Sequence, residues 1–338
     1  MPAEAPVTAK AAPGTGAADR TGSASATAAE PVRHSFLSDM AFTELLVSDQ
    51  RCLTIAPLTG AVRSRAGFAS AAAIISLFDV SASHPTLIAT RPDWTATQDI
   101  SVLGASRIMD GPIVVDSQLV RVGKKTVIAS AEIYDAHGVD DPHELRRRLV
   151  DTAPATGTGT TSGSASGPGS GPQQDVAGLT RAGRALVTFA RIPRIAAPGM
   201  DDYDPGQWIG EIRPPADVVG PPPDHLHDAL GLRLLDAATG QLELDRGPSV
   251  LNSIGTILGG ALAALVEAAA EAMCPDAITI DLQLHYLAQV RSGPARTAGR
   301  VVRDTGEHCV VTMTVVDAGA EDRILALATV TLLRATSA

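Results

Sequence analysis

Two acidic residues occupy matching positions in two similar stretches of this 338-residue chain. Asp79 ends the stretch Ser64–Asp79 (SRAGFASAAAIISLFD), and Glu267 ends the stretch Asn252–Glu267 (NSIGTILGGALAALVE). In each stretch a glycine-containing loop leads into an apolar helical pattern that carries the acid. The first turn of a helix offers backbone N–H groups that lack intrahelical partners, and the helix dipole adds about half a positive charge there. A carboxylate beside such a turn suits chemistry in which a base acts on a carbonyl whose oxygen becomes negative.

The second stretch shows how the acid is presented. Its leucines recur at helical spacing and form one apolar stripe, whereas Glu267 lies off the stripe, on a face of very small residues that runs back to Gly260. A lone glutamate on a helix is usually a solvated surface residue. A face this bare instead favours the close approach of a partner helix or a ligand.

The strands after each helix repeat as well. The segment Thr97–Pro112 (TQDISVLGASRIMDGP) aligns with Thr279–Pro294 (TIDLQLHYLAQVRSGP), which matches Thr97 with Thr279 and both Gly-Pro pairs with each other. Asp135 and Asp317, at the end of the next apolar run, keep the same register. The chain is therefore predicted to be a tandem duplication.

Each copy is expected to contain a hairpin, one long helix and then four strands with short connections. This order favours an α+β fold in which an antiparallel sheet wraps around a single helix, and two such copies in one chain can pair as a pseudo-dimer. In the first copy the predicted segments are a hairpin at 42–47 and 51–56, a helix from Gly67 to about Ser83, and strands near 99–103, 113–122 and 125–134. In the second they are 230–236, 241–245, the stretch 251–273, 278–286, 295–303, 309–316 and 324–333.

Composition shifts divide the chain. Residues 1–34 are mostly Ala, Gly, Thr, Ser and Pro and are predicted to be a disordered tail. A Gly/Ser/Thr-rich tract predicts a flexible insertion at about 138–178 inside a first domain of 35–195, because the segment Arg184–Ile192 resembles the closing strand of the second copy. A basic run, 144–149, precedes that tract and is interpreted as an exposed, solvated helix turn. A Pro-rich linker is expected at 196–228 and a second domain at 229–335.

Charge and cysteine content limit the function classes. The formal net charge of −10 gives little support for nucleic-acid binding. The three cysteines are odd in number and scattered, which fits reduced thiols in a cytoplasmic protein better than a disulfide framework. No apolar run reaches the roughly 18 residues of a membrane span, and the N-terminal stretch lacks the features of a secretory signal. We therefore expect a cytoplasmic protein that binds neither nucleic acid nor membrane.

The second copy resembles a known family. The pattern N-x-x-G-x-x-x-G-G followed by an acid, at Asn252, Gly255, Gly259-Gly260 and Glu267, and then T-I-D-L-x-L-x-Y-L at Thr279–Leu287, resembles the hotdog-fold acyl-CoA thioesterases of the PaaI-like type. The resemblance covers about a hundred residues of the second copy well and the first copy only by pattern. It implies a tandem double hotdog that acts on an acyl-CoA and requires no metal and no other cofactor.

The resemblance also assigns roles to residues. It implies that the Gly259 N–H polarises the thioester carbonyl, that Asn252 orients the carbonyl or the attacking water, and that Glu267 is the nucleophile or general base. Thr279 matches a position where some members keep a supporting hydroxyl. The family builds each site across its dimer, which predicts two unlike sites here: the Asn252/Gly259 loop with Asp79, and the loop at Ser64 with Glu267.

The departures from the family pattern separate the two sites. The family's histidine before the glycine pair is Leu258 here, and the first copy has Ser70-Ala71-Ala72 at the corresponding positions, with Ser64 in place of Asn252. Because the first loop is the more degenerate, the site of Asp79 with Asn252 and Gly259 is favoured slightly, and Glu267 remains a candidate. The additional residues predicted to bind substrate are Gly260, Ser64, Thr97, Arg303 and Lys124. Arg303 and Lys124 lie near strand turns, where they face either the CoA phosphates or solvent alone.

Several features receive a structural interpretation. His225 and His227 lack a third metal ligand at a suitable spacing, and His285 is expected to form a structural hydrogen bond on the polar face of its strand. The 3% aromatic content weakly favours an aliphatic acyl group. The alternative function is a catalytically inactive hotdog protein that binds an acyl thioester or another hydrophobic ligand. Assembly of double-hotdog chains into homo-oligomers is compatible with either function.

Overall fold

The computed structural model describes residues 34–104, 106–151, 176, 178–194, 203–218 and 223–334. The predicted tail and most of the predicted insertion lie outside these residues, as does part of the Pro-rich linker. The described residues belong to one compact unit and share a single 13-stranded sheet. Its strand order is β7-β1-β2-β4-β5-β6-β3-β10-β13-β12-β11-β9-β8, and all its pairings are antiparallel.

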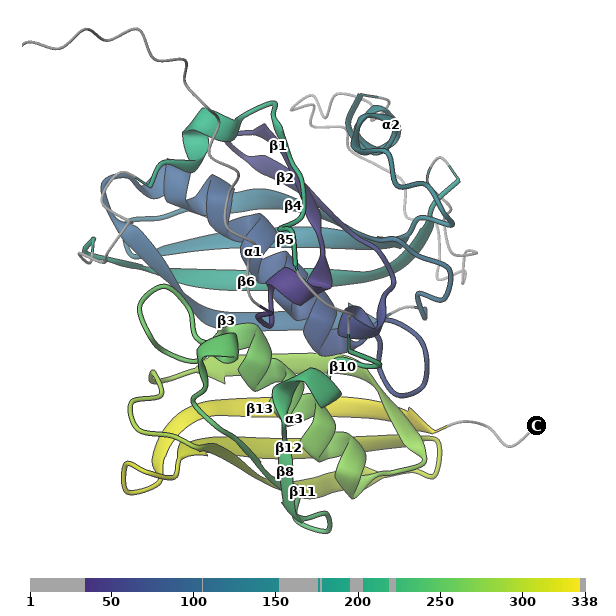
Figure 1. Cartoon of the computed structure of the whole chain (residues 1–338), viewed down its shortest axis with the longest axis vertical. Helices are drawn as coiled ribbons and strands as arrows, with labels where there is room; N and C mark the ends of the chain where they lie inside the picture. Colours follow the sequence, from purple (N-terminus) through teal and green to yellow (C-terminus); the bar gives the residue numbers. More distant parts are fainter. Residues whose placement is uncertain are drawn as a thin grey trace, which may run out of the picture. The chain divides into compact units, whose positions relative to one another are not determined.

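Both copies have the predicted order of hairpin, helix and four strands (Figure 1). The first copy contains β1 (Thr43–Ser48), β2 (Arg51–Ala56), α1 (Ala71–Thr90), β3 (Trp94–Gly104), β4 (Ile113–Val122), β5 (Thr126–Asp135) and β6 (Thr180–Ile192). The second contains β8 (Arg233–Asp236), β9 (Gln241–Leu244), α3 (Gly259–Met273), β10 (Ala277–Tyr286), β11 (Ala295–Asp304), β12 (His308–Asp317) and β13 (Arg323–Arg334). The predicted α+β architecture is therefore confirmed.

The duplication extends to single hydrogen bonds. The Asp135 carboxylate accepts backbone N–H groups from Met109, Asp110 and Gly111, and Asp317 accepts them from the corresponding loop of the second copy, Arg291 to Gly293. Although both carboxylates are buried, these backbone donors hold their pKa values below the usual range. Each aspartate thus fixes the Gly-Pro loop that precedes β4 or β11.

The two copies meet along β3 and β10. These strands pair antiparallel, with Asp99 opposite His285 and Ser101 opposite Gln283. Because Ser101 and Gln283 are equivalent in the duplication, this pair marks a pseudo-twofold axis. His285 contacts the Asp99 carboxylate across the junction, which agrees with the structural role expected for this histidine.

The two helices lie on the same side of the sheet and pack against each other (Figure 1). Gly260 is essential to this contact, since an added Cβ there would lie 2.1 Å from Ser76 Oγ and 2.8 Å from Ser76 Cβ. The small-residue face of α3 thus serves a partner helix. Most buried apolar side chains of both copies form one continuous core, and a smaller cluster lies in the first copy.

Helix α1 differs from its predicted bounds. It begins at Ala71 rather than Gly67, because Ser70 is the N-cap and its hydroxyl accepts the Ala73 N–H. It continues to Thr90 through Pro85, a residue that normally disfavours a helix interior. It is the one helix among the described residues that is long and apolar enough to cross a membrane, and 67% of its apolar window is buried in this fold. It is the core helix of the first copy.

The segment before the Gly/Ser/Thr-rich tract was predicted to be an exposed, solvated helix turn, and its burial was predicted incorrectly. Residues Pro142–Arg146 form α2, which begins at the N-cap Asp141, and a further turn spans Arg147–Asp151. Leu145 is fully buried and Leu149 is nearly so, in a small cluster against β1, β2 and β4. The charged side chains around them concealed this apolar contact in the sequence.

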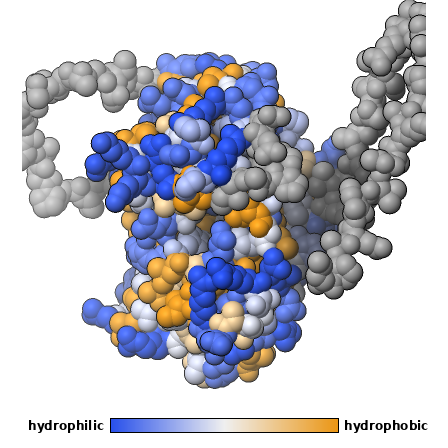
Figure 2. Space-filling view, turned by 90° about the vertical axis from the view of Figure 1, so that its left-hand side faces the viewer, coloured by the Kyte–Doolittle hydropathy of each residue, from blue (hydrophilic) through white to orange (hydrophobic). Residues whose placement is uncertain are grey.

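Part of the linker also packs on the first copy. Strand β7 (Ile212–Arg213) pairs with the edge strand β1. The Trp208 ring lies against His84 of α1, with 5.7 Å between ring centroids, and the Arg213 guanidinium lies 3.9 Å from the Trp208 ring centroid. Figure 2 shows hydrophobic residues in separate patches among hydrophilic ones on one face of the molecule.

Candidate active site

Asp79 projects from the middle of α1 beside the first strand that follows it. Its Oδ1 atom accepts a hydrogen bond of 2.6 Å from the Thr97 hydroxyl on β3. Burial raises the pKa of Asp79 to about 6, and the Thr97 hydrogen bond opposes the rise because it stabilises the ionised form. Asp79 is therefore a carboxylate suited to act as a base near neutral pH.

A cavity of about 380 Å³ joins Asp79 to the second copy. Asp79 and Thr97 line it from the first copy, while Asn252, Leu258 and Gly259 line it from the second. Gly259 is the first residue of α3, and the first intrahelical bonds run to the Leu258 carbonyl from Ala261 and Leu262, at 3.1 Å each. The Gly259 and Gly260 amides thus precede the hydrogen-bonded turns, where a helix offers donors to an anion.

Tyr286 completes this wall of the cavity. Its hydroxyl donates to the Gly259 carbonyl at 2.9 Å. Burial and the nearby charge of Asp79 raise the pKa of Tyr286 well above its ordinary value, so the phenol stays protonated. Tyr286 therefore anchors the first turn of α3, a role that its position at the end of an alternating strand did not reveal.

Asn252 shapes the loop that leads into α3. Its Oδ1 atom accepts backbone N–H groups from Ile254 and Thr256, both at 3.1 Å. This is the local turn geometry typical of asparagine. The carboxamide oxygen is thus engaged with the loop, although the residue lines the cavity as well.

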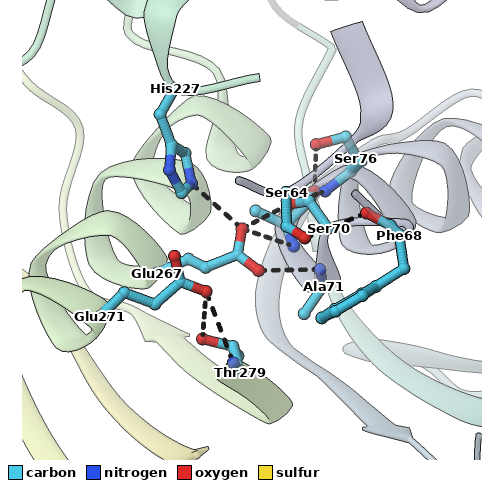
Figure 3. A network of polar contacts seen from close by, with 11 residues as sticks. Ser64, Phe68, Ser70, Ala71, Ser76, His227, Glu267, Glu271 and Thr279 are labelled. Carbon is cyan, nitrogen blue, oxygen red and sulfur yellow. Dashed lines mark hydrogen bonds and ion pairs between the residues drawn. The ribbon is translucent and has the colours of Figure 1, made fainter. Parts of the chain in front are cut away.

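Glu267 lies at the opposite junction and is 1% exposed. Figure 3 shows its carboxylate against the start of α1: Oε1 accepts the Ala71 N–H at 2.9 Å, and Oε2 accepts the Ala72 N–H at 3.4 Å and the Ser70 hydroxyl. His227 Nε2 lies 3.3 Å from Oε2. Glu267 therefore caps the first turn of the other copy's helix.

A second glutamate stands beside Glu267. Glu271 lies one helical turn further along α3 and accepts the Thr279 N–H at 3.4 Å and the Thr279 hydroxyl at 3.3 Å (Figure 3). Burial and the charge of Glu267 raise the pKa of Glu271 to about 7, whereas His227 and Thr279 lower it. Burial opposes protonation of His227, but its hydrogen bond to Glu267 and the charges of Glu267 and Glu271 prevail and raise the pKa of His227.

The two junctions thus differ in what the acid binds. Ala71 and Ala72 correspond to Gly259 and Gly260 in the duplication, and their amides are already bonded to a carboxylate. Glutamate is one methylene longer than aspartate, and that length lets Glu267 reach the opposite helix. Asp79 bonds instead to the hydroxyl of its own copy's β3.

Comparison with known proteins agrees with this architecture. Residues 248–333, which hold α3 and β10–β13, match the family model of the acyl-CoA thioesterase N-terminal domain. The second copy is thus similar to an acyl-CoA thioesterase domain. No curated protein matches the sequence.

Solved structures of thioesterases share the fold over nearly the whole chain. A Lactobacillus plantarum protein described as an oleoyl thioesterase has 10% identity and a TM-score of 0.52, with 86% of this chain and 100% of that chain covered. A Novosphingobium aromaticivorans protein described as a thioesterase has 12% identity and a TM-score of 0.51, with coverages of 87% and 98%. The E. coli PaaI protein matches over a shorter region, with 17% identity, a TM-score of 0.30 and coverages of 32% and 83%.

The remaining predicted residues are dispersed over the fold. Ser64 is buried, and its hydroxyl donates to the Phe68 carbonyl at 3.1 Å, within its own loop. Gly260 packs on α1. Lys124 is exposed in the turn between β4 and β5. The carbonyl groups on either side of it accept hydrogen bonds from Arg191, which pairs with β3 near the Trp94 end of the Asp79 cavity. Arg303 is exposed in the second copy, next to the turn that bonds to Arg334 near the other junction.

Three aromatic or basic residues near the Asp79 cavity were missed from sequence. Tyr203, from the linker, lines the cavity and donates or accepts a hydrogen bond of 2.9 Å with His84 Nε2. Trp94 also lines it, and the Arg194 guanidinium lies 5.9 Å from the Trp94 ring centroid. These residues come together at the cavity only through tertiary contacts between segments far apart in sequence.

Two groups of side chains bring three metal-ligating atoms within 4.8 Å of one another in the described part of the chain. The buried group is Glu44, Cys52 and His84, where Arg213 also pairs with Glu44 at 2.9 Å. The other is Asp110, Asp135 and His137 at an exposed loop. Neither group includes a residue that lines the Asp79 cavity.

Proposed function

We propose that the chain hydrolyses acyl-CoA thioesters at the Asp79 cavity, with Asp79 as the catalytic carboxylate and the amide of Gly259 as the oxyanion donor. The observation that carries the proposal is the contrast between the two helix starts. Glu267 caps the amides of Ala71 and Ala72, whereas Asp79 bonds to Thr97 and shares a cavity with Gly259. Among the described residues, only the Asp79 junction has a carboxylate that does not cap the start of the facing helix.

The proposed reaction uses groups already in place. The thioester carbonyl oxygen lies at the Gly259 amide, which stabilises the negative charge that develops there; removing one such donor costs roughly 3–4 kcal/mol of transition-state stabilisation. Asp79 takes a proton from a water molecule as the water attacks the carbonyl carbon. The C–S bond then breaks, the thiolate of CoA takes up a proton, and the carboxylic acid leaves.

Direct attack by Asp79 is the other course open to a carboxylate in this position. It forms a mixed anhydride, which water then hydrolyses. A single turnover in ¹⁸O-labelled water distinguishes the two courses. General-base catalysis places the label in the product acid, whereas attack by Asp79 followed by hydrolysis at its own carbonyl places the label in the Asp79 side chain.

The lining of the cavity revises the expectation for the acyl group. Four of the ten aromatic residues in the chain line it, namely Trp94, Phe189, Tyr203 and Tyr286. The low overall aromatic content therefore does not favour aliphatic chains at this site. We propose an acyl or aroyl group here, with Lys124 and Arg194 as the nearest candidates for the CoA phosphates and Arg303 as a less suitable one.

The decisive experiment compares Asp79→Asn with Glu267→Gln in thiol release from a panel that contains octanoyl-CoA, benzoyl-CoA and phenylacetyl-CoA. Asp79→Asn is expected to lower kcat by about 10²–10⁴-fold, while Glu267→Gln retains turnover within a few-fold. Circular dichroism and thermal melting verify that both variants fold. Loss of turnover in Glu267→Gln with an active Asp79→Asn variant would assign catalysis to the other junction.

The alternative function is binding without hydrolysis. It is favoured by Leu258, which replaces a hydrogen-bonding histidine of the family pattern at the residue before Gly259 and makes no side-chain cap to α3. In that case the wild-type protein releases no thiol from any of the three acyl-CoAs. Asp79→Asn then changes only the affinity measured by calorimetry.

A further inference from the structure

Two cysteines that are 35 residues apart in sequence meet inside the second copy. Cys274 is the C-cap of α3, where its N–H bonds to the Ala270 carbonyl, and Cys309 is the second residue of β12. Their Sγ atoms lie 2.8 Å apart. Non-bonded heavy atoms usually stay about 3.5–4.0 Å apart, and a disulfide is about 2.05 Å long. The fold therefore holds these sulfurs closer than an ordinary packing contact.

The fold itself does not require a thiol at either place. The equivalent residues of the first copy are Thr86 at the helix and Val127 at the strand, and both are fully buried. A hydroxyl and an aliphatic side chain thus occupy the two equivalent positions there. The second copy differs by bringing two oxidisable groups together.

The surroundings of the pair determine how readily it reacts. Both side chains are nearly or fully buried, at 4% for Cys274 and 0% for Cys309. Burial and the neighbouring Cys309 raise the pKa of Cys274 to about 12, and Arg334 opposes this rise. Arg334 forms a two-point ion pair with Asp304 close by. Because both thiols are buried, only a small oxidant can reach them. Because the raised pKa makes the thiolate scarce, the reaction is slow.

We propose that Cys274 and Cys309 form an intrachain disulfide when the protein meets a peroxide. The thiolate of one cysteine attacks hydrogen peroxide, which yields a sulfenic acid and hydroxide. The thiol of the other cysteine then displaces the oxygen as water, so that the S–S bond forms and the two electrons end on the peroxide oxygens. Protonation of the hydroxide completes the balance: two thiols and one peroxide give one disulfide and two waters.

The cross-link ties the end of α3 to the sheet. The same helix begins with Gly259, so the tether fixes the element that presents the proposed oxyanion donor. Closing a loop of this length restricts the unfolded chain. The oxidised protein should melt at a temperature higher by about 5–10 °C, within the range that one disulfide gives a domain of this size.

The test treats the folded full-length protein with hydrogen peroxide, removes the peroxide, and then unfolds the protein in urea so that an alkylating agent traps the remaining buried thiols. Peptides are mapped by mass spectrometry without reduction. The expected result is one linked pair of peptides that contains Cys274 and Cys309, with Cys52 alkylated as the internal control. Cys52 is also fully buried, and no other cysteine is paired with it in the structure. Dithiothreitol should restore all three thiols and the original melting temperature.

The matched variants copy the residues of the first copy. Cys274→Thr and Cys309→Val should fold and should lose the peroxide-induced rise in melting temperature, while Cys52→Ala should keep it. Separate alkylation of Cys274 and Cys309 after peroxide treatment would overturn the proposal. So would conversion of either one to a sulfinic acid without a linked peptide.

Discussion

At the scale of single residues, the length of one side chain separates the two junctions. Glu267 reaches the amides of Ala71 and Ala72, and its carboxylate becomes part of the helix cap. Asp79, at the equivalent position, bonds to Thr97 on its own copy. The same duplicated scaffold thus supports a structural carboxylate at one end and a candidate catalytic one at the other.

The substitution Asp79→Glu tests this explanation. The longer side chain is expected to reach the amides of Gly259 and Gly260, as Glu267 reaches their counterparts, and to block the oxyanion site. We expect kcat for acyl-CoA hydrolysis to fall by at least about 100-fold. Full activity of Asp79→Glu, measured beside Glu267→Asp as the reciprocal change, would contradict the explanation.

Thr97 is expected to adjust the acidity of Asp79. Its hydroxyl stabilises the ionised form, so Thr97→Val should raise the pKa of Asp79 above about 6. The acidic limb of the kcat/KM profile should then move to higher pH, while the plateau at alkaline pH is largely kept. Thr95→Val makes the same chemical change two residues earlier, at another residue that lines the cavity. An unchanged limb in Thr97→Val would argue against Asp79 as the titrating base.

At the scale of elements, the site depends on how closely α1 and α3 approach each other. Each helix carries an acid in its middle and presents its first turn to the other copy. Gly260 permits this approach because its missing side chain leaves room for Ser76. The helix propensity of glycine is poor, so its presence in the first turn reflects packing rather than local preference.

Gly260→Ala should therefore harm both stability and activity. The added methyl group forces the helices apart, at an expected cost of about 1–3 kcal/mol in the free energy of unfolding. It also moves Gly259 away from Asp79, so kcat should fall more than the loss of folded protein explains. Gly247→Ala is the control, because an added Cβ there meets no atom within 4 Å. Urea unfolding and thiol-release assays measure both effects, and equal behaviour of the two variants would refute the packing argument.

At the scale of the whole molecule, one sheet and one core join the copies, and ionisable groups are buried where they meet. Burial raises the pKa of Asp79 to about 6 and that of Glu271 to about 7. Folding then favours the protonated forms of both groups. Their contribution to stability is fully present below their unfolded pKa values, near 4, and is lost as the pH rises through 6 and 7. His227 changes stability in the same direction, because its folded pKa is also raised.

The free energy of unfolding should accordingly decrease between pH 5 and pH 8. Glu271→Gln should reduce this decrease by about 1–3 kcal/mol, the order expected for a pKa shift of this size. Chemical unfolding at several pH values measures the difference. A Glu271→Gln variant with the same pH dependence as the wild type would show that Glu271 titrates normally.

The assembly of double-hotdog chains into homo-oligomers stays a prediction. Size-exclusion chromatography of the wild-type protein tests it.

The duplication and the order of elements could be predicted from sequence, because they depend on local periodicity and on patterns that recur within the chain. The alternation of Ile278 to Tyr286 predicted β10, and the repeated Asp135 and Asp317 indicated two equivalent loops. Helix starts were less accurate. Gly67 and Gly255 adopt positive φ angles in the loops before the helices, and Ser70, rather than either glycine, caps α1.

The sequence alone determined that two acids and two helix starts exist, since residue type and spacing are local properties. Only the tertiary structure decided which groups bind each other. The 2.9 Å hydrogen bond from Ala71 to Glu267 joins residues nearly 200 positions apart. The contact between His227 of the linker and Glu267 joins residues 40 positions apart. Whether one additional methylene reaches such a partner depends on the same packing. Such distances follow from packing across the pseudo-twofold junction, which no local pattern encodes.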